Sequence, residues 1–471
     1  MPVFILICIS CSKKQPYSIL EFTGEGAVVN DSKGPFEIYN ADSVHSVSLL
    51  AEPGDIINLE GLPFYYRDIS TTKYSFEQNG DNLYINGKIY NIDIPEEDSL
   101  VEWFDTLMAS DISGLELIRF PFPIPENYVP FINEISKLKP NIGIVIGENW
   151  WDGWDSCCVN EELLEIIENF NPRFLRYGYL TTDNLEELSR FKDLEVLELG
   201  LVDTILSGSL PPLPHLKRLK DLSLYVFSED LDEDSVIIPV DYLKNILRNN
   251  TQIENLATCQ FANGDRIDSL DISFISPLKR LKKLRIGVNL VSLLIDIPTL
   301  KNIQILREMK HLEFVNVDYC SAGMDTIFDD LTNIRWLSLY YDTTPGDLST
   351  IVKFHPNLEV LTIYNDTILN LQPLLGLSGL YGLIIMDTLT DRSTLLSMKN
   401  LKYLSLPSYL ESDSLYYASL QDSLPGCKIA FNEKLGGCLG SGWLFLLIPF
   451  IMLFSFLGRL KFSSIRKYFI F

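Results

Sequence analysis

Residues able to carry catalysis are few and scattered in this chain. Its four histidines are His45, His215, His311 and His355, and the last three each stand just before a short apolar segment. The sequence contains no G-x-S-x-G turn, no H-E-x-x-H zinc pair and no glycine-rich phosphate loop. Catalytic groups can assemble from distant positions, so an enzyme with an unrecognised site stays open. We nevertheless expect a protein that is not an enzyme and uses no cofactor.

The cysteines do not form a metal-binding or redox pattern. The one C-x-x-C spacing, Cys8 to Cys11, lies in an apolar stretch with no second pair nearby, and a zinc or thioredoxin-like site needs more than this pair. We expect Cys259, Cys320 and Cys427 to be buried thiols, as free cysteines commonly are.

An acidic segment begins like a calcium-binding loop. Asp230, Asp232 and Asp234 have the spacing of the first ligands, but Ser235 takes the sixth place, where such a loop needs glycine, and Pro239 takes the tenth. The pattern favours a solvated acidic loop without metal and leaves calcium binding from Asp230 to Asp234 open.

Three of the six tryptophans, Trp150, Trp151 and Trp154, fall within five positions. Tryptophans in a loop can cover the core of the protein, which is the simpler interpretation. Exposed tryptophan also anchors protein interfaces and sugars, so this segment is a second candidate binding site, for carbohydrate or peptidoglycan.

The charge balance narrows the class of partner. The formal net charge is −25, and the segment after Cys438 has four basic and no acidic residues, so the part before it carries −29. Such a surface repels phosphate backbones and anionic lipid. We therefore expect no nucleic-acid partner, whereas basic partners and divalent cations remain open.

A phrase of the form L-x-x-L-x-L dominates the chain, for example from Leu358 to Ile363, from Leu380 to Ile385 and from Leu401 to Leu406. Successive phrases are separated by 21 to 34 residues, which is the signature of one structural unit stacked on itself. The apolar first, fourth and sixth positions indicate a short strand followed by a turn into helix or coil. The phrase begins at Leu115, Ile142, Pro172, Leu194, Leu219, Ile253, Leu281, Leu312, Ile334, Leu358, Leu380 and Leu401.

These phrases resemble the leucine-rich-repeat family, and the spacing from Leu371 to Ile385 is similar to that of bacterial internalin-type repeats. The resemblance implies an α/β solenoid over residues 100–431, with a curved parallel sheet on the concave side and helices or coil on the convex side. It also implies an extended surface for binding. The segment Leu424–Phe431 is expected to be the last edge strand.

Side-chain alternation along each strand indicates which residues face the hollow of this solenoid. If the first, fourth and sixth positions of each phrase face the core, the positions between them face the concave side. Aromatic residues in such places are typical of a protein-binding patch, although cross-strand stacking that only stabilises the sheet is the alternative. The candidate binding residues are Phe314, Trp336, Tyr340, Tyr364, Tyr381 and Tyr403.

Residues 12–99 are expected to form a small β-rich module or cap that covers the first strand of the solenoid. Leu83–Ile85 followed by Asn86-Gly87 is a hairpin signal. Acidic residues at 96–98 and the helical spacing of apolar residues up to position 110 predict the first helix of the solenoid.

The first eleven residues resemble a bacterial lipoprotein leader, with Cys11 at the place of the lipidated cysteine. The segment lacks a basic start, and the residue three places before Cys11 is Cys8 rather than leucine. We expect export of the protein; lipid attachment at Cys11 and a plain leader are the two alternatives.

The C-terminal end has the pattern of a membrane segment. After a linker at 432–438, residues 439–457 are uncharged, which meets the length of about 20 residues needed to cross the bilayer. The basic residues within 459–471 then place this tail in the cytoplasm and the repeats outside. A transmembrane helix at 439–458 is one interpretation. The segment also resembles C-terminal sorting signals of bacterial surface proteins, in which the membrane segment is removed.

Together these features predict a protein of the bacterial cell envelope, anchored in the membrane with its repeats exported, that binds a protein or peptide on its concave aromatic face. The alternatives are a carbohydrate- or peptidoglycan-binding surface protein, or an enzyme.

Overall fold

The chain is described from a computed structural model. The description covers residues 17–24, 28–29, 46–59, 61–67, 71–80, 82–94, 100–120, 126–146, 161–203, 212–228, 240–262, 269–290, 299–318, 331–340, 348–364, 367–368, 370–386 and 388–432.

Each of the twelve apolar phrases forms a strand that begins one or two residues after the first position of the phrase. A further strand, β25 (Lys428–Asn432), follows them as the expected edge strand. The twelve are β9 (Leu117–Phe120), β10 (Gly143–Ile146), β11 (Phe174–Thr181), β12 (Val196–Asp203), β13 (Asp221–Ser228), β14 (Asn255–Ala262), β16 (Lys283–Leu290), β18 (Phe314–Asp318), β19 (Trp336–Tyr340), β20 (Val360–Tyr364), β22 (Gly382–Ile385) and β24 (Tyr403–Pro407).

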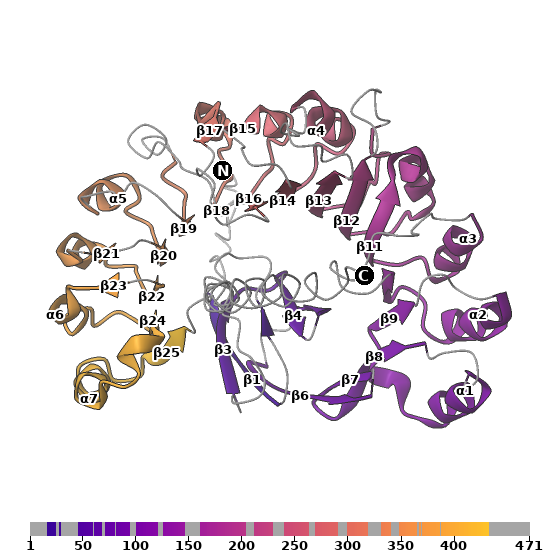
Figure 1. Ribbon diagram of the computed structural model, residues 1–471, viewed down its shortest axis with the longest axis horizontal. Coiled ribbons are helices and arrows are strands. Elements are labelled where there is room, and N and C mark those ends of the chain that lie inside the picture. Colours follow the sequence, from indigo (N-terminus) through magenta and orange to yellow (C-terminus); the bar gives the residue numbers. More distant parts are fainter. Residues whose placement is uncertain are drawn as a thin grey trace, which may run out of the picture.

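These strands lie side by side in parallel, in chain order, from β9 to β25. The fold is therefore a leucine-rich-repeat solenoid. Two small parallel pairs lie on its outer side (Figure 1), and they are β15 (Ser269–Asp271) with β17 (Thr299–Lys301), and β21 (Thr367–Ile368) with β23 (Thr388–Leu389).

Helices and 3-10 turns cover the convex side of the sheet (Figure 1). The helix predicted before residue 110 is α1. In α4 the apolar residues recur at the spacing of one helix face. The α-helices are α1 (Leu100–Ala109), α2 (Val129–Leu138), α3 (Glu161–Phe170), α4 (Val240–Leu247), α5 (Ser349–Phe354), α6 (Arg392–Leu395) and α7 (Ser414–Ser423). The 3-10 turns are η2 (Ile112–Gly114), η3 (Glu126–Tyr128), η4 (Thr182–Arg190), η5 (Ile272–Ile275), η6 (Ile303–Glu308), η8 (Gln372–Gly376) and η9 (Ser408–Leu410).

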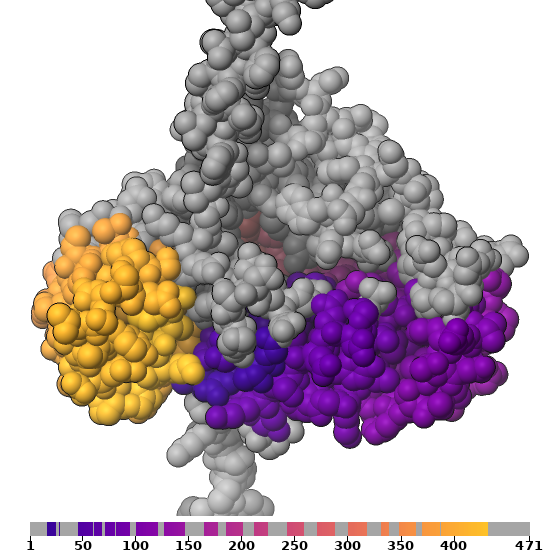
Figure 2. Space-filling view, turned by 60° about the horizontal axis from the view of Figure 1, so that its bottom comes forward, coloured from indigo at the N-terminus to yellow at the C-terminus, as the bar shows by residue number. Residues whose placement is uncertain are grey.

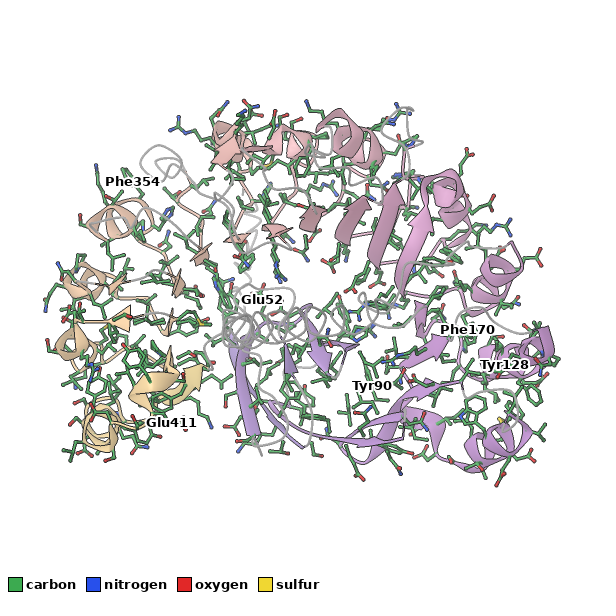
Figure 3. The ribbon with its side chains drawn as sticks, viewed as in Figure 1. Glu52, Tyr90, Tyr128, Phe170, Phe354 and Glu411 are labelled. Carbon is green, nitrogen blue, oxygen red and sulfur yellow. The ribbon has the colours of Figure 1, made fainter. Side chains whose placement is uncertain are left out.

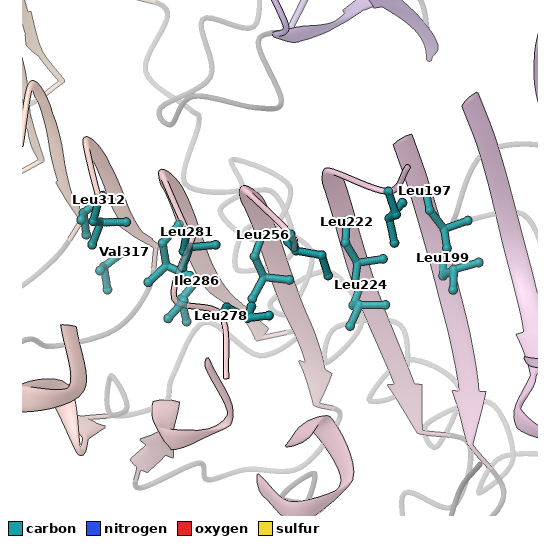
Figure 4. Packing of buried hydrophobic residues seen from close by; sticks show 14 of the residues in the cluster. Leu197, Leu199, Leu222, Leu224, Leu256, Leu278, Leu281, Ile286, Leu312 and Val317 are labelled. Carbon is teal, nitrogen blue, oxygen red and sulfur yellow. The ribbon is translucent and has the colours of Figure 1, made fainter. Parts of the chain in front are cut away.

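The outer core lies between the sheet and these helices. The phrase positions that were expected to face inward form one buried ladder, which includes Leu197, Leu222, Leu256 and Leu312 (Figure 4). One repeat alone would leave this apolar edge in water, so the burial is supplied by the neighbouring repeats.

The N-terminal residues form the expected β-rich module. Its strands are β1 (Ser18–Thr23), β2 (Val28–Val29), β3 (Ser46–Ala51), β4 (Ile56–Leu59), β5 (Leu62–Tyr65), β6 (Lys73–Asn79), β7 (Asn82–Ile85) and β8 (Lys88–Asp93). The predicted hairpin joins β7 to β8, and Asn86 and Gly87 both have positive φ, as its tight turn requires. Strand β8 pairs in parallel with β9 and so covers the edge of the first repeat.

The module continues the repeat sheet instead of forming a separate layer. Among the described residues, eighteen strands make one sheet, and the pairings give the order β3-β1-β6-β7-β8-β9 followed by the repeat strands to β25. Strands β2, β4 and β5 form a small sheet of their own, and β4 lies inside the ring made by the large sheet (Figure 1).

The two ends of the large sheet come together. The Tyr403 hydroxyl on β24 donates a 3.0 Å hydrogen bond to the carbonyl of Ser48 on β3, and Lys428 Nζ on β25 lies 3.5 Å from Glu21 Oε1 on β1. Figure 2 shows the C-terminal repeats against the N-terminal strands. The solenoid is thus an almost closed ring, which leaves little sheet edge free for pairing with other chains.

Several predicted features lie outside the described residues. They are the leader with Cys11, the tryptophan segment 150–154, the acidic segment 230–234, the membrane segment 439–458 and the tail 459–471. Within the described residues, no helix combines the length and apolar character needed to span a bilayer.

Candidate functional site

The concave face of the repeat strands carries a continuous row of residues, one from each strand, and two of them, Gly143 and Gly382, are glycines. Register places Asp221, Asn255, Lys283, Phe314 and Trp336 next to one another across β13 to β19. Towards β9 the row continues with Val196, Phe174, Gly143 and Leu117, and towards β24 it continues with Val360, Gly382 and Tyr403. Polar groups therefore sit at the middle of the hollow, between two apolar arms.

Of the aromatic residues predicted to bind a partner, those whose side chains the structure describes face the hollow, but three of them are covered by the protein itself. Phe314, Trp336 and Tyr403 are each at most 2% exposed. They form an inner apolar cluster with Tyr17 and Leu50 of the module. The expectation of a solvent-facing patch is wrong for these three, because the module occupies the concave side that the strand pattern leaves open.

Ring contacts and hydrogen bonds define this junction. Tyr17 packs edge-on against Trp336 with ring centroids 5.1 Å apart, and Phe314 meets Trp336 at 5.6 Å. The partly buried Tyr381 accepts a 3.0 Å hydrogen bond from the backbone N–H of Tyr17 through its hydroxyl. The side chains of Tyr340 and Tyr364, which complete the predicted set, lie outside the described part of the structure.

Charged residues hold the module at the middle of the hollow. Lys283 Nζ contacts Asp55 Oδ1 at 2.9 Å and Glu52 Oε1 at 3.0 Å, and Arg335 Nη1 lies 3.7 Å from Glu52 Oε2. Figure 3 shows Glu52 inside the ring. Burial by itself lowers the pKa of Lys283, but the two carboxylates outweigh it and raise the pKa, so the lysine stays charged. Removing one partner of such a buried ion pair strongly destabilises the folded state, because it leaves the other charge buried and unpaired.

Asp221 has a different electrostatic environment. Burial raises its pKa to about 6, although Lys283 and a hydrogen bond from Asn255 act in the opposite direction. A raised carboxyl pKa in a concave site is a feature of catalytic acids. Ser223, Glu198 and Lys283 line the small space beside Asp221, but the described lining includes no histidine or cysteine.

An opening lies at the seam between the module and the first repeats. This seam cavity has a volume of about 320 Å³, at the lower end of the range of ligand pockets. Its buried floor comes from strands that are distant in sequence, namely β5, β6, β7, β9 and β11. The floor residues are Phe64, Tyr74, Ile85, Leu117 and Phe174.

A glycine lets the floor of the seam cavity pack closely. Gly143 on β10 lies between Leu117 and Phe174 in the concave row. A Cβ atom at Gly143 would come within 2.8 Å of Leu117 Cδ1 and 3.3 Å of Phe174 Cβ. Any larger residue would therefore push into the floor of the cavity.

The rim of the seam cavity is more basic than the protein as a whole. Arg67, Lys88 and Arg173 line it, and Glu116 is the one carboxylate among the described lining residues. Arg67 lies over the Tyr65 ring, 4.6 Å from its centroid, and its guanidinium reaches Glu116 at 3.8 Å.

Sequence reasoning missed the seam cavity. Its residues come from seven strands and the segments between them, and only the pairing of these strands brings them together. The one available signal was Gly143 itself, a residue without a side chain at a concave position where neighbouring repeats carry Leu117 and Phe174.

Metal and acid–base chemistry find little support in the described residues. They hold no group of three His, Cys, Asp or Glu side chains that could bind a metal ion. His355 is fully buried, with Nδ1 3.3 Å from the Leu331 carbonyl, and burial lowers its pKa to about 4. His215 Nδ1 contacts the Asn249 carbonyl at 2.8 Å. The half-buried thiol of Cys427 has a pKa raised to about 12 by burial, so it is a poor nucleophile.

Comparison with known proteins gives structural neighbours only, because no protein-family model and no curated protein sequence matches the chain. An internalin, inlF, from Listeria monocytogenes is similar over 67% of this chain and 86% of its own, with 15% identity and a TM-score of 0.33. The internalin inlC2 from the same species is similar over 51% and 82%, with 14% identity and a TM-score of 0.26.

A TLR13–ssRNA13 complex is similar over 71% of this chain and 53% of its own, with 16% identity and a TM-score of 0.36. At such TM-scores the fold assignment rests on the strand register and not on these neighbours.

Proposed function

We propose that this chain is a leucine-rich-repeat binding protein of the cell envelope whose partner is a protein or peptide. The observation that carries the proposal is the seam cavity, because it joins an apolar floor to a polar rim at the size of one or two side chains. Sites that recognise peptides combine an apolar pocket with a few placed polar groups in this way.

The site differs from the concave aromatic patch expected from the sequence. Phe314, Trp336 and Tyr403 are buried against the module, so a partner reaches them only if the module moves away. The seam cavity is open without such a movement, which favours it as the place of contact.

Selection of peptides from a random display library tests this function. The full-length protein should enrich a family of related peptides, and synthetic copies should bind it in solution. Muropeptides and short glycans, the ligands of the carbohydrate-binding alternative, should not compete. Failure to enrich any peptide, or binding of glycans alone, would contradict the proposal.

The proposal includes attachment to the envelope. Its support is sequence alone: the leader with Cys11 and the uncharged segment 439–457 followed by basic residues. Intact-mass measurement of the protein extracted from membranes tests it. Added lipid mass on a chain beginning at Cys11, or a retained C-terminal segment, is the expected result. A protein that stays in the soluble fraction with neither feature would overturn this part.

A further inference from the structure

We infer that the seam cavity takes a peptide segment in which an aromatic side chain is flanked by carboxylates. The inference rests on the proposed function and adds to it the chemical class of the ligand. It is carried by the floor, the rim and the charges of the cavity.

The floor fits a flat apolar group. The Phe64 and Tyr74 rings meet edge to face with centroids 5.0 Å apart, and Tyr90 is 5.6 Å from Phe64. Tyr90 is part of β8 and is labelled in Figure 3. A further ring can join such a cluster in the edge-on or offset arrangement that aromatic pairs prefer. Leu117, Gly143 and Phe174 line the cavity beside these rings, so the entering ring would rest against them.

The rim fits carboxylates. Lys88 has no carboxylate partner within 4.0 Å among the described residues, and its one hydrogen bond there, to Ser113 Oγ, is long at 3.5 Å. Arg67 holds Glu116 only at 3.8 Å, and the two side chains are 44% and 55% exposed. Both cations can therefore turn to an incoming carboxylate at little cost, since an exposed pair of this kind contributes about 0–1 kcal/mol.

The third cation plays a different part. Arg173 makes a bidentate contact with Glu195, in which Nε donates to Oε1 at 3.0 Å and Nη2 donates to Oε2 at 2.9 Å. That geometry fixes the guanidinium in place, so Arg173 shapes the wall, and Arg67 and Lys88 supply the charge for the ligand. In a chain of net charge −25, a rim with this sign selects an acidic segment that the rest of the surface would repel.

Three tripeptides test the inference by fluorine NMR with the full-length protein. The acidic probe is acetyl-Glu-(4-fluorophenylalanine)-Glu-amide, the neutral probe replaces both Glu by Gln, and the third replaces the aromatic residue by 3-fluoroalanine. The acidic probe should bind most tightly, the neutral probe roughly fivefold more weakly, and the alanine probe not at all.

A double variant completes the cycle. In Arg67→Gln with Lys88→Gln, the acidic and neutral probes should bind equally, at the affinity that the neutral probe has for the unchanged protein. The matched control is Arg218→Gln with Lys279→Gln, because both are exposed cations paired with carboxylates away from the cavity. The control should keep the roughly fivefold preference.

The outcomes separate this inference from the function on which it rests. Equal binding of the acidic and neutral probes to the unchanged protein overturns the carboxylate assignment, and binding of the alanine probe overturns the aromatic one. If library-selected peptides bind but are insensitive to the double variant, the binding function stands and the seam assignment falls. If no peptide of either kind binds, both fall.

Discussion

At Asp221 the folded chain stabilises a protonated carboxyl group. The pKa is raised to about 6 by burial, against about 3.9 in an unfolded chain. The folded state therefore binds the proton more strongly, and its stability falls as the pH rises from about 4 to about 6. Above pH 6 the protein carries the full cost of a buried carboxylate.

Replacing this charge tests the assignment. Asp221→Asn should raise the free energy of unfolding at pH 7.5 by about 1–3 kcal/mol and change it little at pH 4. Urea denaturation at the two pH values measures this, with the exposed Asp422→Asn on α7 as the matched control. A loss of stability at pH 7.5 in the Asp221 variant would contradict the burial argument.

At His355 the stability of the folded state depends on pH in the opposite direction. Because burial lowers its pKa to about 4, the folded state favours the neutral ring, and stability is lost as the pH falls from about 6.5 towards 4. The loss expected from this one group is about 3 kcal/mol. His355→Gln should show a shallower decline over that range in thermal unfolding, and an unchanged slope would be inconsistent with a buried neutral imidazole.

At the scale of elements, the repeat strands were predictable and the position of the module was not. The strand signal is local: apolar residues at fixed positions within six residues, such as Leu401, Leu404 and Leu406, can face only one side of a strand. The β7–β8 hairpin was readable for the same reason, since Asn86-Gly87 is a turn that few other residues form.

The module docks through contacts between residues far apart in the chain, and such contacts produce no local spacing pattern in the sequence. The Tyr17 backbone bonds Tyr381 across 364 positions of the chain, and Lys283 meets Asp55 across 228. No spacing rule links residues so far apart. The sequence identified Trp336 and its neighbours as concave, but an aromatic residue on an open sheet looks the same whether it binds a partner or the chain's own N-terminal part.

Truncation of Trp336 distinguishes these two states. If Trp336 is buried under the module, Trp336→Ala should cost about 3–5 kcal/mol of unfolding free energy, as large buried aromatic residues do. An exposed tryptophan would cost less than about 0.5 kcal/mol. Chemical denaturation measures the difference, with Leu415→Ala as a control, since Leu415 is 82% exposed.

At the scale of the whole molecule, closure into a ring explains how the repeat sheet avoids aggregation. A solenoid leaves two sheet edges and a concave apolar surface, both of which favour aggregation. Here β8 covers the edge of β9, β1 and β3 approach β25 and β24, and the module fills the hollow. In the function proposed above, the same arrangement leaves the seam, and not the hollow, accessible to a partner.

Zero-length carbodiimide cross-linking of the native protein tests the closed ring most directly. Lys428 and Glu21 are separated by 407 positions, yet Nζ and Oε1 lie 3.5 Å apart, so mass spectrometry should find their peptides joined within one chain. The Lys279–Glu308 pair on the outer side, 2.5 Å apart, serves as the internal reference. Recovery of the reference cross-link without any between Lys428 or Lys283 and the module would contradict the account.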